Sequence, residues 1–214
     1  MEMIWVNPGT FMMGSPANER GRAIGLEEFQ HRVTLTKGFY MGKYEVTQAQ
    51  WEIVMGASKN LSRTKGASLP ITGVHWRDIV RFISKLNDME RKAGTLPLDK
   101  IYSLPTEAQW EYACRAGTTS AYAVIGQPQS PISEVGKFPA NRWGFHDMNG
   151  NVRELCSGLF VPYPRSAVTD PSFGLKRWDK SSQYRVARGG RSAERHKQSQ
   201  YGTSDSLGFR IVYQ

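Results

Sequence analysis

The sequence predicts a single α+β domain with a small twisted antiparallel sheet, two or three helices and extensive loops. Its 214 residues include 21 glycines and 11 prolines, which interrupt short apolar runs and indicate many turns. Hydrophobic residues make up 39% of the chain and charged residues 22%, which is enough apolar area for a buried core. No stretch has the composition of a linker, so we expect residues 1–214 to form one domain.

The amino-terminal part is typical of strands joined by tight turns. Apolar and polar residues alternate in residues 3–15, around a Pro-Gly pair, and again in residues 31–47. This period of two is expected when one side chain in two faces a core. We therefore expect these residues to form an edge of the sheet.

Two helix starts carry the same local signal. Thr47 is followed three residues later by Gln50, and Thr106 is followed in the same way by Gln109. In this capping box the two side chains accept hydrogen bonds from backbone amides that the helix leaves without partners. Gly117 stands where the second of these helices would need a left-handed carboxyl cap.

A further helix is predicted over residues 76–91. Its apolar side chains recur at steps of three and four residues, which places them on one face. The apolar face carries Ile79, Phe82, Ile83 and Leu86, and the opposite face carries Arg77, Arg81, Lys85 and Asp88. We expect this helix to pack on the sheet by its apolar side.

Cysteine usage and charge narrow the functional classes. Cys114 and Cys156 form no CxxC pattern, so two buried thiols are favoured over a single disulfide bond, and a thiolate zinc site is excluded. The net charge is +9, and residues 176–214 carry nine basic and three acidic side chains. This bias suits an acidic partner. Nucleic acid is not favoured, because the chain has no stripe of aromatic and basic residues.

Nothing in the chain indicates a membrane span or a secretion signal. No apolar run approaches the roughly 18 residues that a spanning helix needs. The amino terminus lacks the basic and apolar blocks of a signal peptide. The localisation stays open, and a virion or a cell surface would suit a protein that displays a binding site.

The loop NRWGFHDMNGNVREL, residues 141–155, is rich in hard oxygen ligands. The loop contains glycines whose turns let backbone carbonyls converge, an arrangement that suits calcium better than a transition metal. Its candidate oxygen ligands are Asn141, Asp147, Asn149, Asn151 and Glu154. A network of Asx turns without an ion explains the same residues equally well. The sequence leaves both interpretations open.

Several ordered motifs resemble the formylglycine-generating-enzyme, or sulfatase-modifying-factor, domain. They are GTFMMGSP, HRVTLTKGFYMGKYEVTQAQW, PITGVHWRDIVRFISKL, YSLPTEAQWEYACRAG, NRWGFHDMNGNVREL, RVARGG and a terminal LGFR, and they run nearly end to end. The resemblance implies a C-type-lectin-like fold. It also implies a structural calcium ion held by the side chains of Asp147 and Glu154 and by the carbonyls of Gly150 and Val152.

The chain departs from that family where the chemistry takes place. The resemblance implies that oxidases of the family need two cysteines after the RGG motif, which bind copper and pass electrons, and the matching positions here are Glu194 and Ser199. No thiolate is present in residues 188–214, and carboxylate with hydroxyl does not replace the soft ligands of Cu(I). A related iron branch uses closely spaced histidines, whereas the histidines here are scattered. We therefore expect no catalytic residue and no required cofactor.

The segment of residues 188–210 is the candidate functional element. It resembles the hypervariable segment of variable proteins from diversity-generating retroelements, in which mutation at template adenines produces a restricted set of residue types. On that logic Glu194, Lys197, Gln198 and Gln200 are fixed or differently templated. The candidate diversified, ligand-binding positions are Arg191, Ser192, Arg195, His196, Ser199, Tyr201, Thr203, Ser204, Asp205 and Ser206.

The sequence thus favours a non-enzymatic protein that displays a diversified surface to a macromolecular ligand, most simply a protein. Trp143, Tyr163 and Trp178 are expected to support that surface. Ser, Gly and Tyr supply adaptable hydrogen bonds and rigid contact area in binding loops. An oxidase or degenerate enzyme homologue, and an accessory structural subunit, are the alternatives. The oligomeric state is not indicated.

Overall fold

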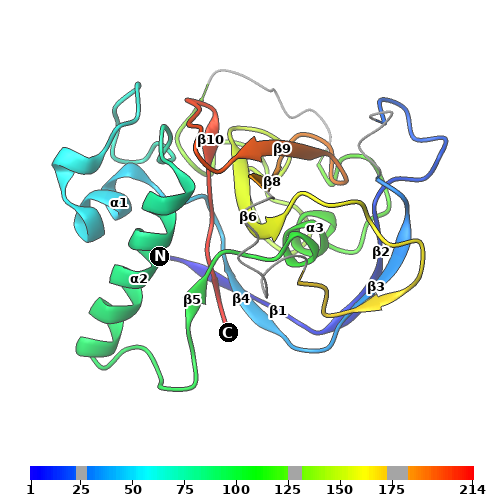
Figure 1. The fold of residues 1–214 in the computed structure, drawn as a ribbon, viewed down its shortest axis with the longest axis horizontal. Helices are drawn as coiled ribbons and strands as arrows, with labels where there is room; N and C mark the ends of the chain where they lie inside the picture. The colour runs from blue at the N-terminus through cyan, green and yellow to red at the C-terminus, as the bar shows by residue number, and fades with distance from the viewer. Residues whose placement is uncertain (23–27, 125–131, 173–182) are drawn as a thin grey trace.

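A computed structural model describes residues 1–22, 28–124, 132–172 and 183–214. It confirms an α+β fold, built from three small sheets, three α-helices and long connecting loops (Figure 1). The strand orders are β1-β4-β11-β5, β10-β6-β8-β9 and β2-β3-β7. Most neighbouring strands are antiparallel, but β6 with β10 and β3 with β7 run parallel.

The element bounds follow the sequence expectations closely at the amino-terminal end. The strands are β1 Met3–Val6, β2 Gly9–Met13, β3 His31–Leu35, β4 Phe39–Gly42, β5 Tyr102–Ser103, β6 Arg153–Leu159, β7 Val168–Thr169, β8 Tyr184–Arg188, β9 Arg195–Ser199, β10 Leu207–Gly208 and β11 Val212–Tyr213. The helices are α1 Gln48–Met55, α2 Trp76–Lys92 and α3 Glu107–Arg115, with a 3-10 turn at Ala57–Lys59.

Both predicted capping boxes are present. The hydroxyl of Thr47 accepts a hydrogen bond from the amide of Gln50 at 3.2 Å, and the Gln50 side chain accepts one from the Thr47 amide at 3.1 Å. Thr106 and Gln109 repeat the arrangement at 3.1 and 2.9 Å. The end of α3 differs from the expectation, because Ala116 is the residue at its carboxyl cap. Both Ala116 and Gly117 have positive φ, so the turn is left-handed over two residues.

One part of the core lies between α1, α2 and the carboxyl-terminal strands. The apolar face of α2 buries Ile79, Phe82 and Leu86, as the spacing predicts. The ring of Phe82 stacks on Trp51 of α1 at 5.3 Å and meets the edge of Phe209 at 5.5 Å. Burying such side chains stabilises the fold by about 1.5 to 3 kcal/mol each. This contact fixes the LGFRIV segment against the first two helices.

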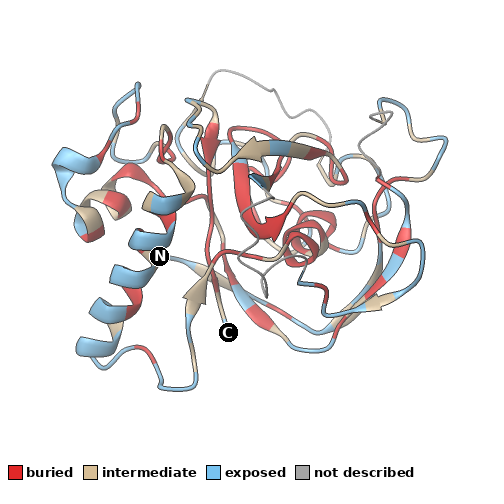
Figure 2. Ribbon diagram, in the orientation of Figure 1, coloured by how far each residue is buried: buried red, intermediate tan, exposed pale blue. Residues whose placement is uncertain are grey.

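The helix α3 lies at the centre of the molecule (Figure 2). Eight of its nine residues are buried, including three charged ones, Glu107, Glu111 and Arg115. By contrast, α2 exposes a whole charged face. A helix with buried charge on all sides must find ionic partners on the elements around it. Arg115 pairs with Glu111 of the same helix, and Glu107 and Glu111 pair with arginines of the candidate functional segment.

The structure also bears on the expectations about the two cysteines and about a membrane-spanning helix. Both cysteines are buried and free, so no disulfide bond joins them. No helix within the described ranges combines the length and the hydrophobicity that crossing a bilayer requires.

Candidate ligand-binding surface

The candidate segment begins as a β-hairpin. Strands β8 and β9 pair in an antiparallel register from Tyr184 opposite Ser199 to Arg188 opposite Arg195. The connecting turn needs its two glycines, because Gly189 and Gly190 have φ of 136° and 87°. A Cβ at Gly190 would also lie 2.6 Å from the carboxylate of Glu194. We call residues 188–195 the anchored turn and residues 196–206 the exposed arm.

Three of the predicted binding residues are buried in the anchored turn, which corrects the expectation that they face a ligand. Arg191, Ser192 and Arg195 are 5%, 0% and 0% exposed. The guanidinium of Arg195 donates to both carboxylate oxygens of Glu107 at 2.6 and 3.0 Å and to the carbonyl of Val161 at 2.9 Å. A side chain held in this way stabilises the domain and is not available for contact with another molecule.

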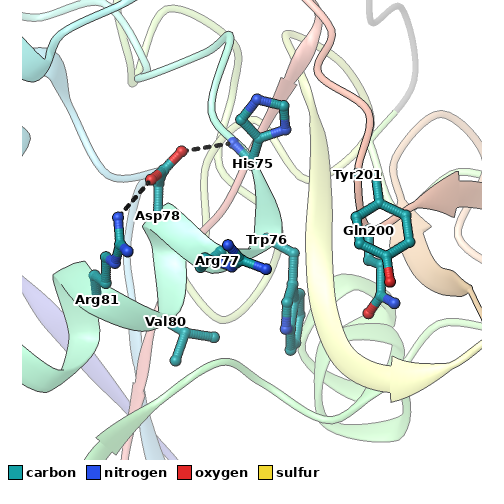
Figure 3. A pocket seen from close by; sticks show the side chains of 8 residues that line it. All are labelled: His75, Trp76, Arg77, Asp78, Val80, Arg81, Gln200 and Tyr201. Carbon is teal, nitrogen blue, oxygen red and sulfur yellow. Dashed lines mark hydrogen bonds and ion pairs between the residues drawn. The ribbon is translucent and has the colours of Figure 1, made fainter. Parts of the chain in front are cut away.

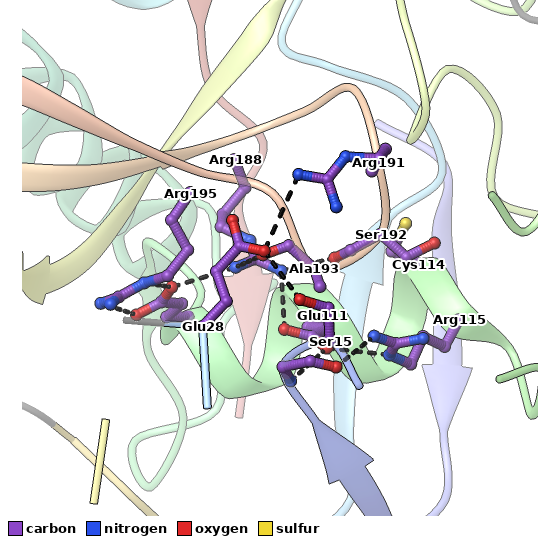
Figure 4. Close-up of polar contacts among 12 residues, drawn as sticks. Ser15, Glu28, Glu111, Cys114, Arg115, Arg188, Arg191, Ser192, Ala193 and Arg195 are labelled. Atoms are coloured by element: carbon purple, nitrogen blue, oxygen red, sulfur yellow. Dashed lines mark hydrogen bonds and ion pairs between the residues drawn. The ribbon is translucent and has the colours of Figure 1, made fainter. Parts of the chain in front are cut away.

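Arg188 completes the buried ionic cluster. It donates to Glu107 at 3.1 Å and to Glu111 at 2.7 Å, and Glu111 also pairs with Arg115 at 2.8 Å (Figure 4). Burial alone would raise the pKa of Glu107. The charges of Arg195 and Arg188 outweigh burial and hold this pKa below its ordinary value. Glu107 is therefore an ionised partner of these arginines, and its ion pairs hold the anchored turn against α3.

Arg191 ties the same turn to the amino-terminal loop. Its guanidinium donates to Glu19 at 2.6 Å and lies 3.8 Å from Glu28, and both carboxylates are buried or nearly so.

The sequence contained one signal for the buried ionic cluster on α3. The acidic residues Glu107 and Glu111 are four positions apart on a helix flanked by apolar residues, which places two carboxylates on one buried face.

The exposed arm keeps the other seven predicted positions at or near the surface. Tyr201 is 63% exposed, and its hydroxyl makes no hydrogen bond with the described residues. We define the binding face as the seven positions that remain accessible: His196, Ser199, Tyr201, Thr203, Ser204, Asp205 and Ser206. The arm then returns to the core at Leu207 and Phe209, which are buried.

The three supporting aromatic residues are not brought together on this face. Tyr163 is 4% exposed, and its hydroxyl donates to Glu107 at 2.7 Å, so it belongs to the buried ionic cluster. Trp143 is half-buried and packs against the ring of Tyr112 at 4.9 Å. Trp178 lies outside the described residues. Tyr163 is therefore a structural residue and does not support a ligand.

The residues implied for calcium do not fit that ion together. Both carboxylate oxygens of Glu154 accept bonds from Arg210, at 2.6 and 2.7 Å, and one also accepts from the Trp110 indole at 2.7 Å. Burial would lower the pKa of Arg210, but Glu154 and the nearby Asp147 outweigh burial and raise it. The guanidinium thus supplies the positive charge that this carboxylate needs.

Asp147 is likewise engaged by protein groups. Its two oxygens accept hydrogen bonds from the backbone amides of Gly136 and Phe138 at 2.6 and 3.2 Å. The backbone of Gly150 and Val152 borders a polar cleft instead. In the described ranges, no three His, Cys, Asp or Glu side chains come together as a metal site. The side chains of Asp147 and Glu154 are thus engaged by protein groups.

The polar cleft, of about 280 Å³, lies beside the anchored turn and contains Glu194 and His196. The imidazole Nε2 of His196 is 3.2 Å from the Glu194 carboxylate, which also accepts a bond from the Arg191 amide at 3.1 Å. The hydrogen bond from His196 lowers the pKa of Glu194 to about 2. Glu194, the position where the family resemblance expects a cysteine, is thus an ionised carboxylate.

A second hollow, of about 400 Å³, lies between the amino-terminal end of α2 and the tip of the exposed arm (Figure 3). Trp76 and Val80 come from the helix, and Gln200 and Tyr201 come from the arm. We call this hollow the α2 groove. Its volume lies within the range of small-molecule and side-chain pockets.

Comparison with known proteins places the chain in a family. The model of the sulfatase-modifying factor enzyme 1-like domain matches residues 1–214, and the chain belongs to this family. It is 32% identical to the formylglycine-generating enzyme of Mycobacterium tuberculosis over 150 residues, 51% of this chain and 50% of that protein. The chain spans 38% to 63% of the length of the first curated relatives that it matches.

Two solved structures share the fold nearly end to end. PvdO from Pseudomonas aeruginosa has a TM-score of 0.82 at 23% identity and covers 99% of this chain and 94% of its own. Treponema denticola variable protein 1 has a TM-score of 0.79 at 23% identity and covers 98% of this chain and 94% of its own. The expected C-type-lectin-like fold of the formylglycine-generating-enzyme type is therefore confirmed.

Proposed function

We propose that this domain is a non-enzymatic binding protein that presents the binding face to a macromolecular ligand, most simply a protein. The observation that carries the proposal is the division of the carboxyl-terminal segment. Buried arginines hold the anchored turn against α3, while the seven residues of the binding face are left accessible. Substitutions on such a face change what is bound and leave the supporting core intact.

The proposal includes diversification of the kind found in variable proteins of retroelements, now restricted to the binding face. The similarity in fold between this domain and Treponema denticola variable protein 1 supports this proposal. Arg191 and Arg195 are removed from the candidate diversified positions, because random residues there would leave buried carboxylates without partners. Ser192 is removed because it is fully buried.

The test is a search of the surrounding genomic DNA for a near-copy of the sequence that encodes residues 185–214. We expect a copy that differs at adenines, beside a reverse-transcriptase gene, with differences in the codons of the binding face. Differences spread equally over the codons for Arg191 and Arg195, or the lack of any such copy, would remove diversification from the account.

An oxidase activity is the alternative that the family membership raises. The only thiols are those of Cys114 and Cys156. Burial raises the pKa of Cys114 to about 11 and that of Cys156 well above its ordinary value, so both are neutral near pH 7. Purified protein given copper, oxygen and a cysteine-containing sulfatase peptide should form no formylglycine. Detectable turnover would overthrow the proposal.

A further inference from the structure

The α2 groove has two aromatic walls that belong to different parts of the fold. Trp76 begins α2, and Tyr201 stands across from it on the exposed arm (Figure 3). Val80, 46% exposed, adds an aliphatic surface one turn along the helix. Accessible apolar area enclosed by two separate elements is costly to hydrate, and its coverage by another apolar group would be favourable.

The charge around these walls is positive. Arg77 is exposed and forms no ion pair with the described residues, and Arg81 is mostly exposed. Arg185 does not line the groove, but its guanidinium lies over the ring of Trp76, 4.2 Å from the ring centre. Arg77 and Arg81 thus border an apolar surface, and their positive charge favours the approach of an anion.

The acidic residue of the groove offsets only one of these cations, Arg81, and leaves Arg77 without an acidic partner among the described residues. Asp78 accepts a hydrogen bond from the His75 amide at 3.3 Å and lies 3.8 Å from Arg81, so it is already engaged. The amino-terminal end of α2 adds partial positive charge of its own. An acidic group beside an apolar side chain therefore matches both properties of the groove.

We propose that the α2 groove binds an acidic segment of a partner protein, with an apolar side chain held between Trp76 and Tyr201 and a carboxylate near Arg77. This inference rests on the proposed function, because Tyr201 belongs to the binding face. It goes beyond that function by naming the chemistry of the partner. The net charge of +9 favours encounter with such a segment at a distance.

A direct probe is a short fluorescein-labelled peptide with a Phe-Leu core flanked by Asp and Glu, compared with the same peptide flanked by Lys. Binding to the whole domain is followed by fluorescence polarisation at low and moderate salt. The acidic peptide should bind in a saturable, salt-sensitive manner and the basic peptide should not. Equal binding of both peptides overturns the proposal.

Paired variants locate the site. Arg77→Glu and Tyr201→Ala should each weaken acidic-peptide binding at least about tenfold. Lys85→Glu, on the same helix outside the groove, and Tyr122→Ala, at an exposed tyrosine elsewhere, should change it less than about twofold. All four positions are at least partly exposed, so melting temperatures should stay close to that of the parent.

One outcome separates the inference from the proposed function, and two others contradict the inference alone. If the groove variants have no effect while the genomic repeat is found, the binding face stands and only the acidic partner is wrong. If a single-stranded oligonucleotide displaces the peptide and binds more tightly, the partner is a nucleic acid and the inference fails. The inference is also contradicted if Lys85→Glu weakens binding as much as Arg77→Glu, because the loss would then come from the changed net charge of the protein and not from the groove.

Discussion

The anchored turn and the exposed arm are neighbours in sequence and both consist mainly of polar residues, yet they lie in opposite environments. Arg195 is fully buried, whereas Lys197, two residues later on the same strand, is exposed. The difference comes from α3, which presents Glu107 and Glu111 to the first half of the segment. Basic residues that pair with a buried carboxylate are structural. Basic residues that have no such partner remain exposed and available for binding.

The strongest test of this difference replaces the two cations of β9 in turn. Arg195→Met should lower the free energy of unfolding by about 3 to 5 kcal/mol, because it leaves Glu107 buried with fewer partners. The matched variant Lys197→Met should change it by within about 0.5 kcal/mol. Urea denaturation measures both values, and similar losses would erase the distinction between the two halves.

A second anchor follows the exposed arm at Arg210. Glu154→Gln should lower the free energy of unfolding by about 3 kcal/mol, since the buried guanidinium of Arg210 loses its charged partner.

A chelator should leave the melting temperature of the parent protein unchanged, because Arg210 occupies the carboxylate of Glu154. Chelator-sensitive melting that calcium restores would return the ion to this loop.

The pair formed by Glu194 and His196, where the anchored turn meets the exposed arm, should make the stability of the domain sensitive to acid. The folded-state pKa of Glu194 is lowered to about 2, so its pairing with His196 adds stability that is present above the unfolded value near 4.5. That stability should be lost as pH falls from about 4.5 toward 2. Thermal melting across this range should therefore show a steeper loss for the parent than for Glu194→Gln. Parallel curves would contradict the pairing.

The smallest effects belong to the binding face. Thr203→Ala and Asp205→Ala should each shift the free energy of unfolding by within about 0.5 kcal/mol, because both side chains are exposed. Asp205 lies 3.9 Å from Arg63 in an exposed pair, which contributes little. A loss above 1 kcal/mol at either position, measured by urea denaturation, would show that the arm has a structural role.

Local sequence signals predicted the frame of the fold well. The capping boxes at Thr47 and Thr106 and the apolar stripe of α2 depend on neighbours in the chain, so spacing alone reveals them. The buried ionic cluster escaped prediction for the opposite reason. Arg195 and Glu107 are 88 positions apart, and charged residues are rarely buried unless paired. Only the fold shows that the pairing exists.

The same limit applies to the binding site. Tyr201 could be singled out from sequence as a residue for contact, but its partner across the groove could not. Trp76 was expected only as the first residue of a helix. The groove exists because the exposed arm folds back over the start of α2, and this is a property of the tertiary structure.

The most direct measurement is a saturation mutagenesis scan of residues 188–206 in which folding is scored by protease resistance of the displayed domain. Positions 188, 191, 192 and 195 should reject nearly all substitutions, whereas positions 196, 199, 201 and 203–206 should accept most. This contrast follows from the burial of the first set and the exposure of the second. Equal tolerance across the two sets would contradict the division between an anchored turn and an exposed arm.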